Sequence, residues 1–164
     1  MKRMHLHIGV DDIDQSVKFY STLFAAEPTV HKPDYAKWML DDPRVNFAIT
    51  PTNHTAKGVE HIGIQVETPE ELTEVYERLK LAGRPVLEEG ATTCCYAQSE
   101  KNWITDPDGV IWETFLTNGE TTAYGNKMQV AVAHAKLDAL EAAHASSNSC
   151  CAPQYKNILS LNNE

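Results

Sequence analysis

Apolar and polar residues alternate along residues 4–10, MHLHIGV, and this period of two predicts a β-strand. The even positions are apolar, while the odd positions carry His5 and His7 on the other face. Asp12 follows as a helix cap, with Gln15 at the third helical position. The apolar residues of this helix, which we expect to pack in the core, are Val17, Phe19, Tyr20, Leu23 and Phe24.

Two short extended segments, 36–40 and 45–50, complete this first unit, and the same pattern then starts again. VEHIGIQV, residues 59–66, is a predicted strand, and Thr68 opens the sequence TPEE, which places proline and glutamate at favoured helix-start positions. The helix that follows is expected to end at Gly83. Further extended segments are expected near residues 92–96, 102–105 and 110–116.

The chain is therefore a tandem repeat of a strand, a helix and about three strands. Asp12 and Thr68 lie 56 residues apart, as do His5 and His61, and this register keeps both strand-to-helix connections equal in length. A competing register aligns HIGV with HIGI and pairs His7 with His61. His7 lies on the same strand face as His5 and stays a second candidate for the same site.

The chain changes character after about residue 118. Residues 128–145 are alanine-rich with apolar residues at helical spacing, which predicts a terminal helix. The serine- and asparagine-rich tail that follows is expected to be mobile. We thus expect a domain over residues 1–120, with modules at about 1–55 and 56–120, and a C-terminal helix and tail over 121–164.

Composition narrows the classes of function. The net charge of −9 argues against nucleic-acid binding, because nothing would offset phosphate repulsion. No apolar run approaches the roughly 20 residues of a membrane helix, and the N-terminus has a basic start without a small-residue cleavage site. The sequence therefore predicts a cytoplasmic protein that does not interact with membranes.

The four cysteines form two adjacent pairs, Cys94-Cys95 and Cys150-Cys151. Neighbouring side chains of a strand point to opposite faces, so both members of a pair cannot enter one core. A disulfide within a pair would be strained, and a reducing compartment favours thiols. The pairs are thus either unremarkable thiols, one buried and one exposed, or ligands of something else.

Two matching strand positions hold His5 and His61, and the strand GVIWETFLT places Glu113 on a face with bulky apolar neighbours. Each of the three has an ordinary explanation alone: a hydrogen-bonded histidine, or a carboxylate facing water. Together they form a 2-His-1-carboxylate set with open coordination positions, which suits a divalent transition metal and Fe(II) in particular. A buried carboxylate also needs such a partner.

The repeated unit resembles the vicinal oxygen chelate superfamily, which includes glyoxalase I, extradiol dioxygenases and bleomycin-resistance proteins. The resemblance implies an α+β fold of two tandem βαβββ modules that form a cupped mixed sheet around a metal. Ligands in that family come from the first and last strands of the modules, which match His5, His61 and Glu113. Where some members supply a fourth ligand, this chain offers Phe47 or Ile49.

Residues 1–120 more specifically resemble the organoarsenical carbon–arsenic lyase and cadmium-induced protein group. The matching stretches are VDDIDQSVKFYSTLFAAEP, DYAKWML, HIGIQV, TTCCYAQSEKNWITDPDGVIWETF and the CC of the tail. In that group the adjacent cysteines bind trivalent arsenic beside the metal, which here implies Cys94 and Cys95. Some members have glutamine at the position of His5. For both sulfurs to converge, the strand must bend there.

The resemblance implies an Fe(II)- and O2-dependent lyase that cleaves trivalent organoarsenicals such as methylarsenite to arsenite, for arsenic detoxification. Ni, Co or Zn would occupy the metal site without turnover. Cys150 and Cys151 would scavenge arsenic, and the protein would act as a monomer or homodimer. The alternatives are a protein that sequesters cadmium or arsenite without turnover, and a glyoxalase-like isomerase, against which the missing fourth ligand and the thiols argue.

Overall fold

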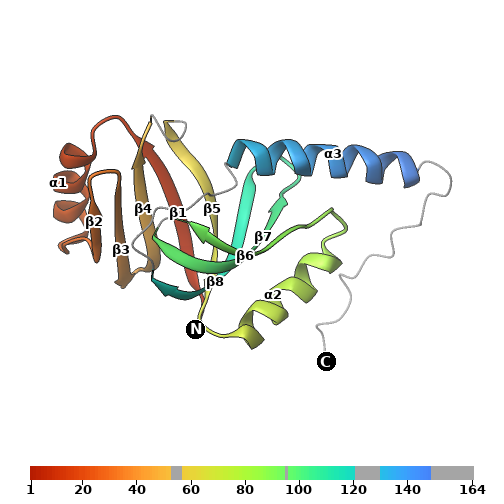
Figure 1. Ribbon diagram of the computed structural model, residues 1–164, viewed down its shortest axis with the longest axis horizontal. Coiled ribbons are helices and arrows are strands. Elements are labelled where there is room, and N and C mark those ends of the chain that lie inside the picture. Colours follow the sequence, from red (N-terminus) through yellow and green to blue (C-terminus); the bar gives the residue numbers. More distant parts are fainter. Residues whose placement is uncertain (53–56, 95, 121–129, 149–164) are drawn as a thin grey trace, which may run out of the picture.

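The computed structural model describes residues 1–52, 57–94, 96–120 and 130–148, and it is an α+β structure (Figure 1). The first module consists of β1 (Arg3–Val10), α1 (Ile13–Phe24), β2 (Val30–Lys32), β3 (Tyr35–Asp41) and β4 (Arg44–Pro51). The second consists of β5 (Gly58–Val66), α2 (Pro69–Leu81), β6 (Leu87–Cys94), β7 (Ala97–Thr105) and β8 (Ile111–Glu120), followed by α3 (Val130–Asn148). The two βαβββ modules predicted from the sequence are confirmed.

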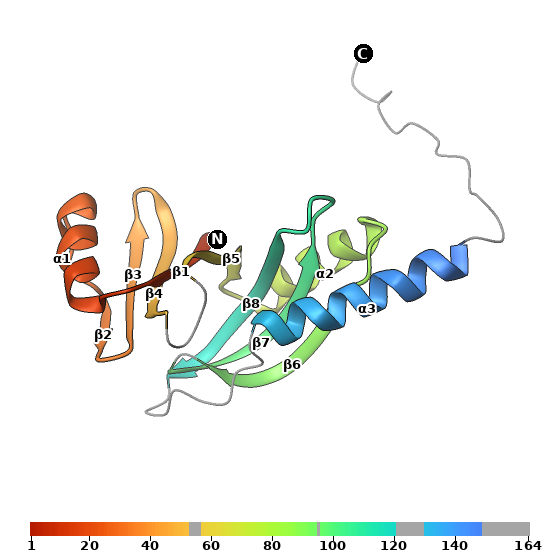
Figure 2. The same ribbon diagram turned by 90° about the horizontal axis from the view of Figure 1, so that it is seen from above.

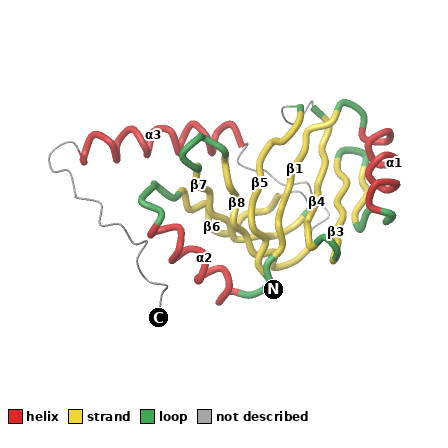
Figure 3. The backbone as a smooth tube through the Cα atoms, turned by 180° about the vertical axis from the view of Figure 1, so that it is seen from behind, coloured by secondary structure: helices red, strands yellow, loops and turns green. Residues whose placement is uncertain are grey.

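All eight strands belong to one mixed sheet in the order β2-β3-β4-β1-β5-β8-β7-β6 (Figure 3). Within each module the first and last strands pair in parallel, β1 with β4 and β5 with β8. The modules join through an antiparallel pairing of β1 with β5. The first strand of each module therefore lies at the centre of the sheet, where the two predicted histidine positions can meet.

Helix α1 covers one face of the first module at the end of the sheet (Figure 1). Its start is the predicted cap, because the Asp12 carboxylate accepts hydrogen bonds from the backbone and side-chain amides of Gln15. Trp38 is fully buried beneath it, and its indole donates to the Ala26 carbonyl. The expectation that all apolar residues of α1 are core was wrong: Phe19 and Leu23 are 61% and 62% exposed, because they lie on the side of the helix away from the sheet.

Helices α2 and α3 lie on opposite sides of the second module (Figure 2). Thr68 caps α2 through the Glu71 amide, and α2 packs on aliphatic residues of β5 and β8. Helix α3 packs on Trp103 and Ile111 through Leu137. Since Trp103 and Lys101 alternate with residues on the other face of β7, α3 covers the face that also carries the site.

Two local predictions need correction. The segment near 92–96 is not one strand: β6 begins at Leu87 and ends at Cys94, and Tyr96 adopts a left-handed conformation (φ 64°) in the turn to β7. Strand β2 was missed because three residues at a sheet edge carry too little periodicity. Among the described residues, no helix is long and apolar enough to cross a membrane.

Candidate metal centre

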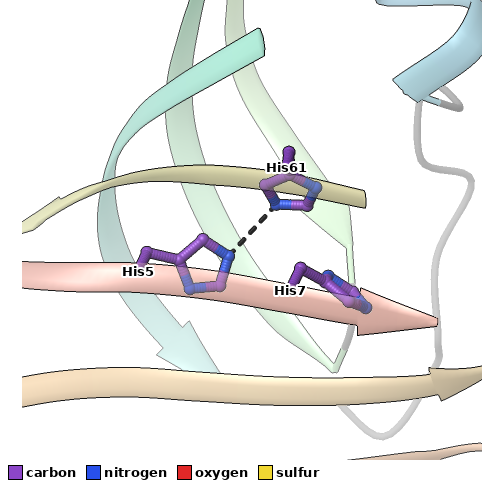
Figure 4. Close-up of side chains that lie close together, drawn as sticks. All are labelled: His5, His7 and His61. Atoms are coloured by element: carbon purple, nitrogen blue, oxygen red, sulfur yellow. Dashed lines mark hydrogen bonds between the residues drawn. The ribbon is translucent and has the colours of Figure 1, made fainter. Parts of the chain in front are cut away.

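The central strands bring three histidines together (Figure 4). In the antiparallel pairing of β1 with β5, His7 lies opposite His61, and His5 lies opposite Gly63. His5 and His7 are on one face of β1 because they are two residues apart, and both point toward His61. The Nε2 atoms of His5 and His61 are 3.1 Å apart. All three side chains are buried.

Strand β8 adds Glu113 to this group. Its Oε2 lies 3.6 Å from His5 Nε2 and 3.5 Å from His61 Nε2, and the residue is 2% exposed. Glu113 is the register partner of Gly63 on β5. A Cβ on Gly63 would lie 2.1 Å from the Glu113 carbonyl oxygen, so only glycine allows β8 to approach this closely. The structure therefore brings together His5, His61 and Glu113.

An oxygen atom lies on the far side of each of the two central imidazoles: a hydrogen-bonded backbone carbonyl at His5 and a carboxylate at His61. The Nδ1 of His5 lies 3.1 Å from the Asn46 carbonyl oxygen, which can only accept. The Nδ1 of His61 lies 3.3 Å from Glu60 Oε2. His5 thus carries its proton on Nδ1, and its Nε2 is the acceptor in the hydrogen bond with His61 Nε2 (Figure 4).

A proton between the two Nε2 atoms holds these donors together in the metal-free protein, and a metal ion can take its place. Donor atoms bound at about 2.1 Å to one ion are separated by about 3.0–3.4 Å, close to the separations of 3.1–3.6 Å found here. The mixed nitrogen and oxygen set suits a divalent transition metal. The buried donors therefore fit a divalent transition-metal ion.

His7 gives this site a second possible donor set. His5, His7 and His61 each offer a ring nitrogen, and these nitrogens lie within 4.8 Å of one another. His7 Nε2, however, is hydrogen-bonded to Thr50 Oγ1 at 2.9 Å. The Nδ1 of His7 lies 3.6 Å from Glu60 Oε2. His7 is thus occupied on both sides of its ring, whereas the Glu113 Oε2 faces the centre.

Lys101 forms an ion pair with the other carboxylate oxygen of Glu113. Its Nζ donates to Glu113 Oε1 at 2.6 Å, and the ammonium lies over the rings of Phe115 and Trp103 at 5.7 and 5.9 Å from their centroids. This ion pair holds one carboxylate oxygen away from the histidines and turns the other toward them. Of the two oxygens of Glu113, Oε2 is therefore the one directed at the space between the imidazoles.

The protonation preferences of the three donors differ. Burial alone would raise the pKa of Glu113, but Lys101 and the two histidines hold it well below its usual range. Burial and the neighbouring His61 lower the pKa of His5 to about 3. Burial opposes charge on His61 as well, yet Glu113 and Glu60 raise its pKa above the usual value. A proton on His61 is thus the natural competitor of a metal ion.

The position expected for a fourth ligand was assigned to the wrong face of β4. Phe47 and Ile49 are buried in the core beneath α1, and Asn46 and Thr50 lie on the site face instead. The alternation in RVNFAITP already separates the two faces, with Val45 joining the apolar one. Asn46 and Thr50 were missed as residues of the site, although this alternation places them on the face opposite Phe47 and Ile49.

The predicted thiol pair is only partly described by the structure. Cys94 is the last residue of β6 and pairs with Ala97 across the hairpin, while Cys95, Cys150 and Cys151 lie outside the described residues. The cavity that contains His5, His61 and Glu113 extends to Ala97 and Ser99 at the start of β7. Its other wall includes Tyr35, Trp103 and Phe115.

The hairpin that carries Cys94 is tied to the other module. The Tyr96 hydroxyl donates to Asp34 Oδ1 at 2.8 Å, and the Tyr96 ring lies 6.1 Å from that of Tyr35. This contact joins the β6–β7 turn to the β2–β3 turn. The backbone next to the cysteines is therefore held at the same cavity that contains the three donors.

The chain is similar to one protein family and to several proteins over most of their length. Residues 2–114 match the family model of the Glyoxalase/Bleomycin resistance protein/Dioxygenase superfamily. A trivalent organoarsenical cleaving enzyme of Bacillus sp. (strain MD1) is 39% identical over 157 residues, covering 93% of this chain and 92% of the relative. One of Thermomonospora curvata is 31% identical, covering 94% and 91%. The cadmium-induced protein CadI of Mycobacterium tuberculosis is 33% identical, covering 77% and 83%.

Among solved structures, the Mn(II)-bound glyoxalase of Novosphingobium aromaticivorans superposes with a TM-score of 0.52. The two sequences are 16% identical, and the match covers 78% of this chain and 44% of the glyoxalase chain. At this identity the likeness concerns the fold alone.

Proposed function

The chain belongs to the glyoxalase/bleomycin resistance protein/dioxygenase superfamily, and from this premise we propose that it is an Fe(II)- and O2-dependent carbon–arsenic lyase. Its substrates would be trivalent organoarsenicals such as methylarsenite. The observation that carries the proposal is the buried convergence of His5, His61 and Glu113 in a cavity that reaches the cysteine-bearing hairpin. The names of relatives over nearly the whole chain support the same substrate class.

His5, His61 and Glu113 would hold the ferrous ion, and Lys101 would keep the carboxylate in place. Bound Fe(II) would supply the electron transfer to dioxygen that a Zn(II) ion cannot provide. Three protein donors leave coordination positions open, because Asn46 and Thr50 on β4 supply no charged ligand. The remaining tasks fall to the protein: to orient the substrate and to exclude water.

Cys94 and Cys95 would bind the arsenic of the substrate as thiolates, since trivalent arsenic is soft and thiophilic. Two adjacent thiols can chelate a monosubstituted arsenic and leave its carbon substituent free to project into the cavity. Tyr35, Trp103 and Phe115 provide apolar walls there. Holding arsenical and iron on one frame replaces a bimolecular encounter by a positioned one.

The reaction balances without an added reductant. One methylarsenite, CH3As(OH)2, and one O2 give one arsenous acid, As(OH)3, and one formaldehyde. The carbon–arsenic bond breaks, the carbon loses four electrons to dioxygen, and arsenic stays trivalent. Cys150 and Cys151 would assist by capturing arsenicals in the tail, without taking part in this step.

Sequestration without turnover is the second candidate. The relative named as a cadmium-induced protein favours it, since thiolates bind cadmium and arsenite alike. Stoichiometry separates the two functions. A sequestering protein removes at most as much arsenical as it has sites, whereas a lyase forms arsenite continuously.

The test is to incubate the reduced, Fe(II)-loaded protein with excess methylarsenite in air and to quantify arsenite by chromatography with arsenic detection. The proposal predicts arsenite well beyond one equivalent per chain, together with formaldehyde. A double substitution Cys94→Ser and Cys95→Ser should abolish it. The same double substitution at Cys150 and Cys151 is the matched control and should retain most of the turnover. Depletion that stops at site stoichiometry without arsenite would establish sequestration.

A further inference from the structure

Strand β5 contains a bulge next to His61. The register passes from His7 opposite His61 to Ile8 opposite Val59, so β5 contains one extra residue, Glu60, at this step. In a regular strand Glu60 and His61 would point to opposite faces. A bulge turns an extra residue toward the face of its neighbour, and here it brings the Glu60 carboxylate beside the imidazole of His61.

The Glu60 carboxylate lies between two imidazoles. Its Oε2 is 3.3 Å from His61 Nδ1 and 3.6 Å from His7 Nδ1, and the side chain is 7% exposed. The two rings themselves are 5.0 Å apart. A carboxylate at such depth is costly unless charged or hydrogen-bonding groups surround it. An apolar side chain would fill this space at a lower cost, so a carboxylate here indicates an electrostatic or hydrogen-bonding role toward the two imidazoles.

We propose that Glu60 is a positioning residue of the metal centre, which accepts the Nδ1 proton of His61 and thereby fixes its Nε2 lone pair toward Glu113 and His5. The inference rests on the metal site in the proposed function. A carboxylate that accepts from a metal-binding histidine fixes the ring tautomer and raises the basicity of the ligating nitrogen. Through the same oxygen, Glu60 also faces His7 and holds that ring beside the site.

The two central imidazoles are then oriented by different acceptors. His5 donates to a neutral backbone carbonyl of Asn46, whereas His61 faces a carboxylate. With neutral imidazoles, Glu60 and Glu113 carry two negative charges against one positive charge on Lys101. The resulting net charge of −1 attracts a cation to the centre.

The affinity for metal tests this inference without any turnover. We would measure the dissociation constant of Zn(II) by competition with a chromophoric chelator for the wild type, Glu60→Gln and Glu60→Ala. Losing an outer partner of a ligating histidine costs about 10- to 100-fold in affinity, and we expect this range for Glu60→Ala, with a smaller loss for Glu60→Gln. Glu89→Gln is the matched control, because Glu89 lines the same cavity but accepts from Trp103. Its dissociation constant should stay within about twofold of the wild type.

Nitrogen NMR of the metal-free protein supplies an independent reading. At a high pH, where His61 is neutral, the wild-type His61 resonances should indicate a proton on Nδ1, and both Glu60 variants should shift toward a mixture of tautomers. Far-UV circular dichroism shows which variants are folded, and Glu60→Gln keeps the inference testable if Glu60→Ala is not. Unchanged affinity and an unchanged tautomer in Glu60→Gln would overturn the role of Glu60. A wild type that binds no divalent metal would overturn the metal centre itself.

Discussion

The two modules share their order of elements but supply different chemistry to one cavity. On the site face, β1 and β4 of the first module provide His5, His7, Asn46 and Thr50, and β3 adds Lys37 to the cavity wall. The second module provides Glu60, Lys101 and Glu113, with His61 among them. A repeated fold therefore sets the positions of the strands, while the side chains of the second copy supply both carboxylates beside the central histidines.

The cores beneath the modules differ in the same way. An aromatic cluster with Trp38 and Phe47 lies under α1, whereas α2 rests on aliphatic residues such as Val66 and Leu116. Within the residues that the structure describes, only the second module has a further helix, α3, on the site face, where it covers Trp103. This extra layer helps to exclude water around the ion pair of Lys101 with Glu113, which strengthens its electrostatics.

Removing the charged ligand should have the largest effect. Glu113→Ala should weaken divalent metal binding by more than about 100-fold, beyond the loss of an outer partner. Asn46→Ala should stay within about twofold of the wild type, because His5 donates to the Asn46 backbone carbonyl, which alanine retains. Chelator competition measures both. If Glu113→Ala kept its affinity and His7→Ala lost it, the ion would be held by the three histidines instead of the mixed set.

A substitution that separates β5 from β8 should have the next largest effect. Gly63→Ala would place its Cβ 2.1 Å from the Glu113 carbonyl oxygen, so the strands must separate. We expect a loss of about 3 kcal/mol in the free energy of unfolding, together with weaker metal binding. Urea denaturation measures the first. Gly119→Ala, which meets nothing within 4 Å, is the matched control; equal stability of the two variants would contradict the strand geometry.

These residues show what the sequence could predict. Alternation fixed which face of β1, β5 and β8 carries His5, His61 and Glu113, and the repeat placed those strands side by side. The bulge at Glu60 could not be foreseen, because it depends on the pairing of β5 with β1. The exposure of Phe19 was missed for a similar reason: helical spacing alone does not define how wide a face the sheet covers.

The histidines of the two modules should respond differently to pH. His61 has a raised pKa, so protonation competes with metal as pH falls through that value, and affinity should drop by about tenfold per pH unit below it. His5, with a pKa of about 3, stays neutral and should not contribute above about pH 4. Metal titrations between pH 8 and 5 measure this slope. A flat profile would contradict the role of His61.

The sign is opposite for the stability of the metal-free protein. Because the pKa of His61 is raised on folding, its contribution to stability is present below the pKa of the unfolded chain and is lost as pH rises through the folded value. Urea denaturation of the metal-free and metal-loaded forms should therefore diverge with increasing pH.

The helix caps provide the smallest contrast between the modules. Asp12→Ala and Thr68→Ala should each lower the free energy of unfolding by about 1 kcal/mol, since each removes an acceptor for an amide at the helix start. Asp12 accepts a second hydrogen bond, from the Gln15 side chain, so its loss should cost slightly more. Urea denaturation at fixed pH measures both. A larger loss for Thr68→Ala would reverse this ranking.

Anomalous scattering from one crystal can show whether iron and arsenic bind at the proposed residues. The crystal would be grown without oxygen, loaded with Fe(II) and methylarsenite, and measured at the iron and arsenic absorption edges. The proposed function predicts one iron peak between His5 Nε2, His61 Nε2 and Glu113 Oε2. It also predicts one arsenic peak at Cys94 and Cys95 in the same cavity. Iron held without Glu113, or arsenic bound only at Cys150 and Cys151, would contradict it.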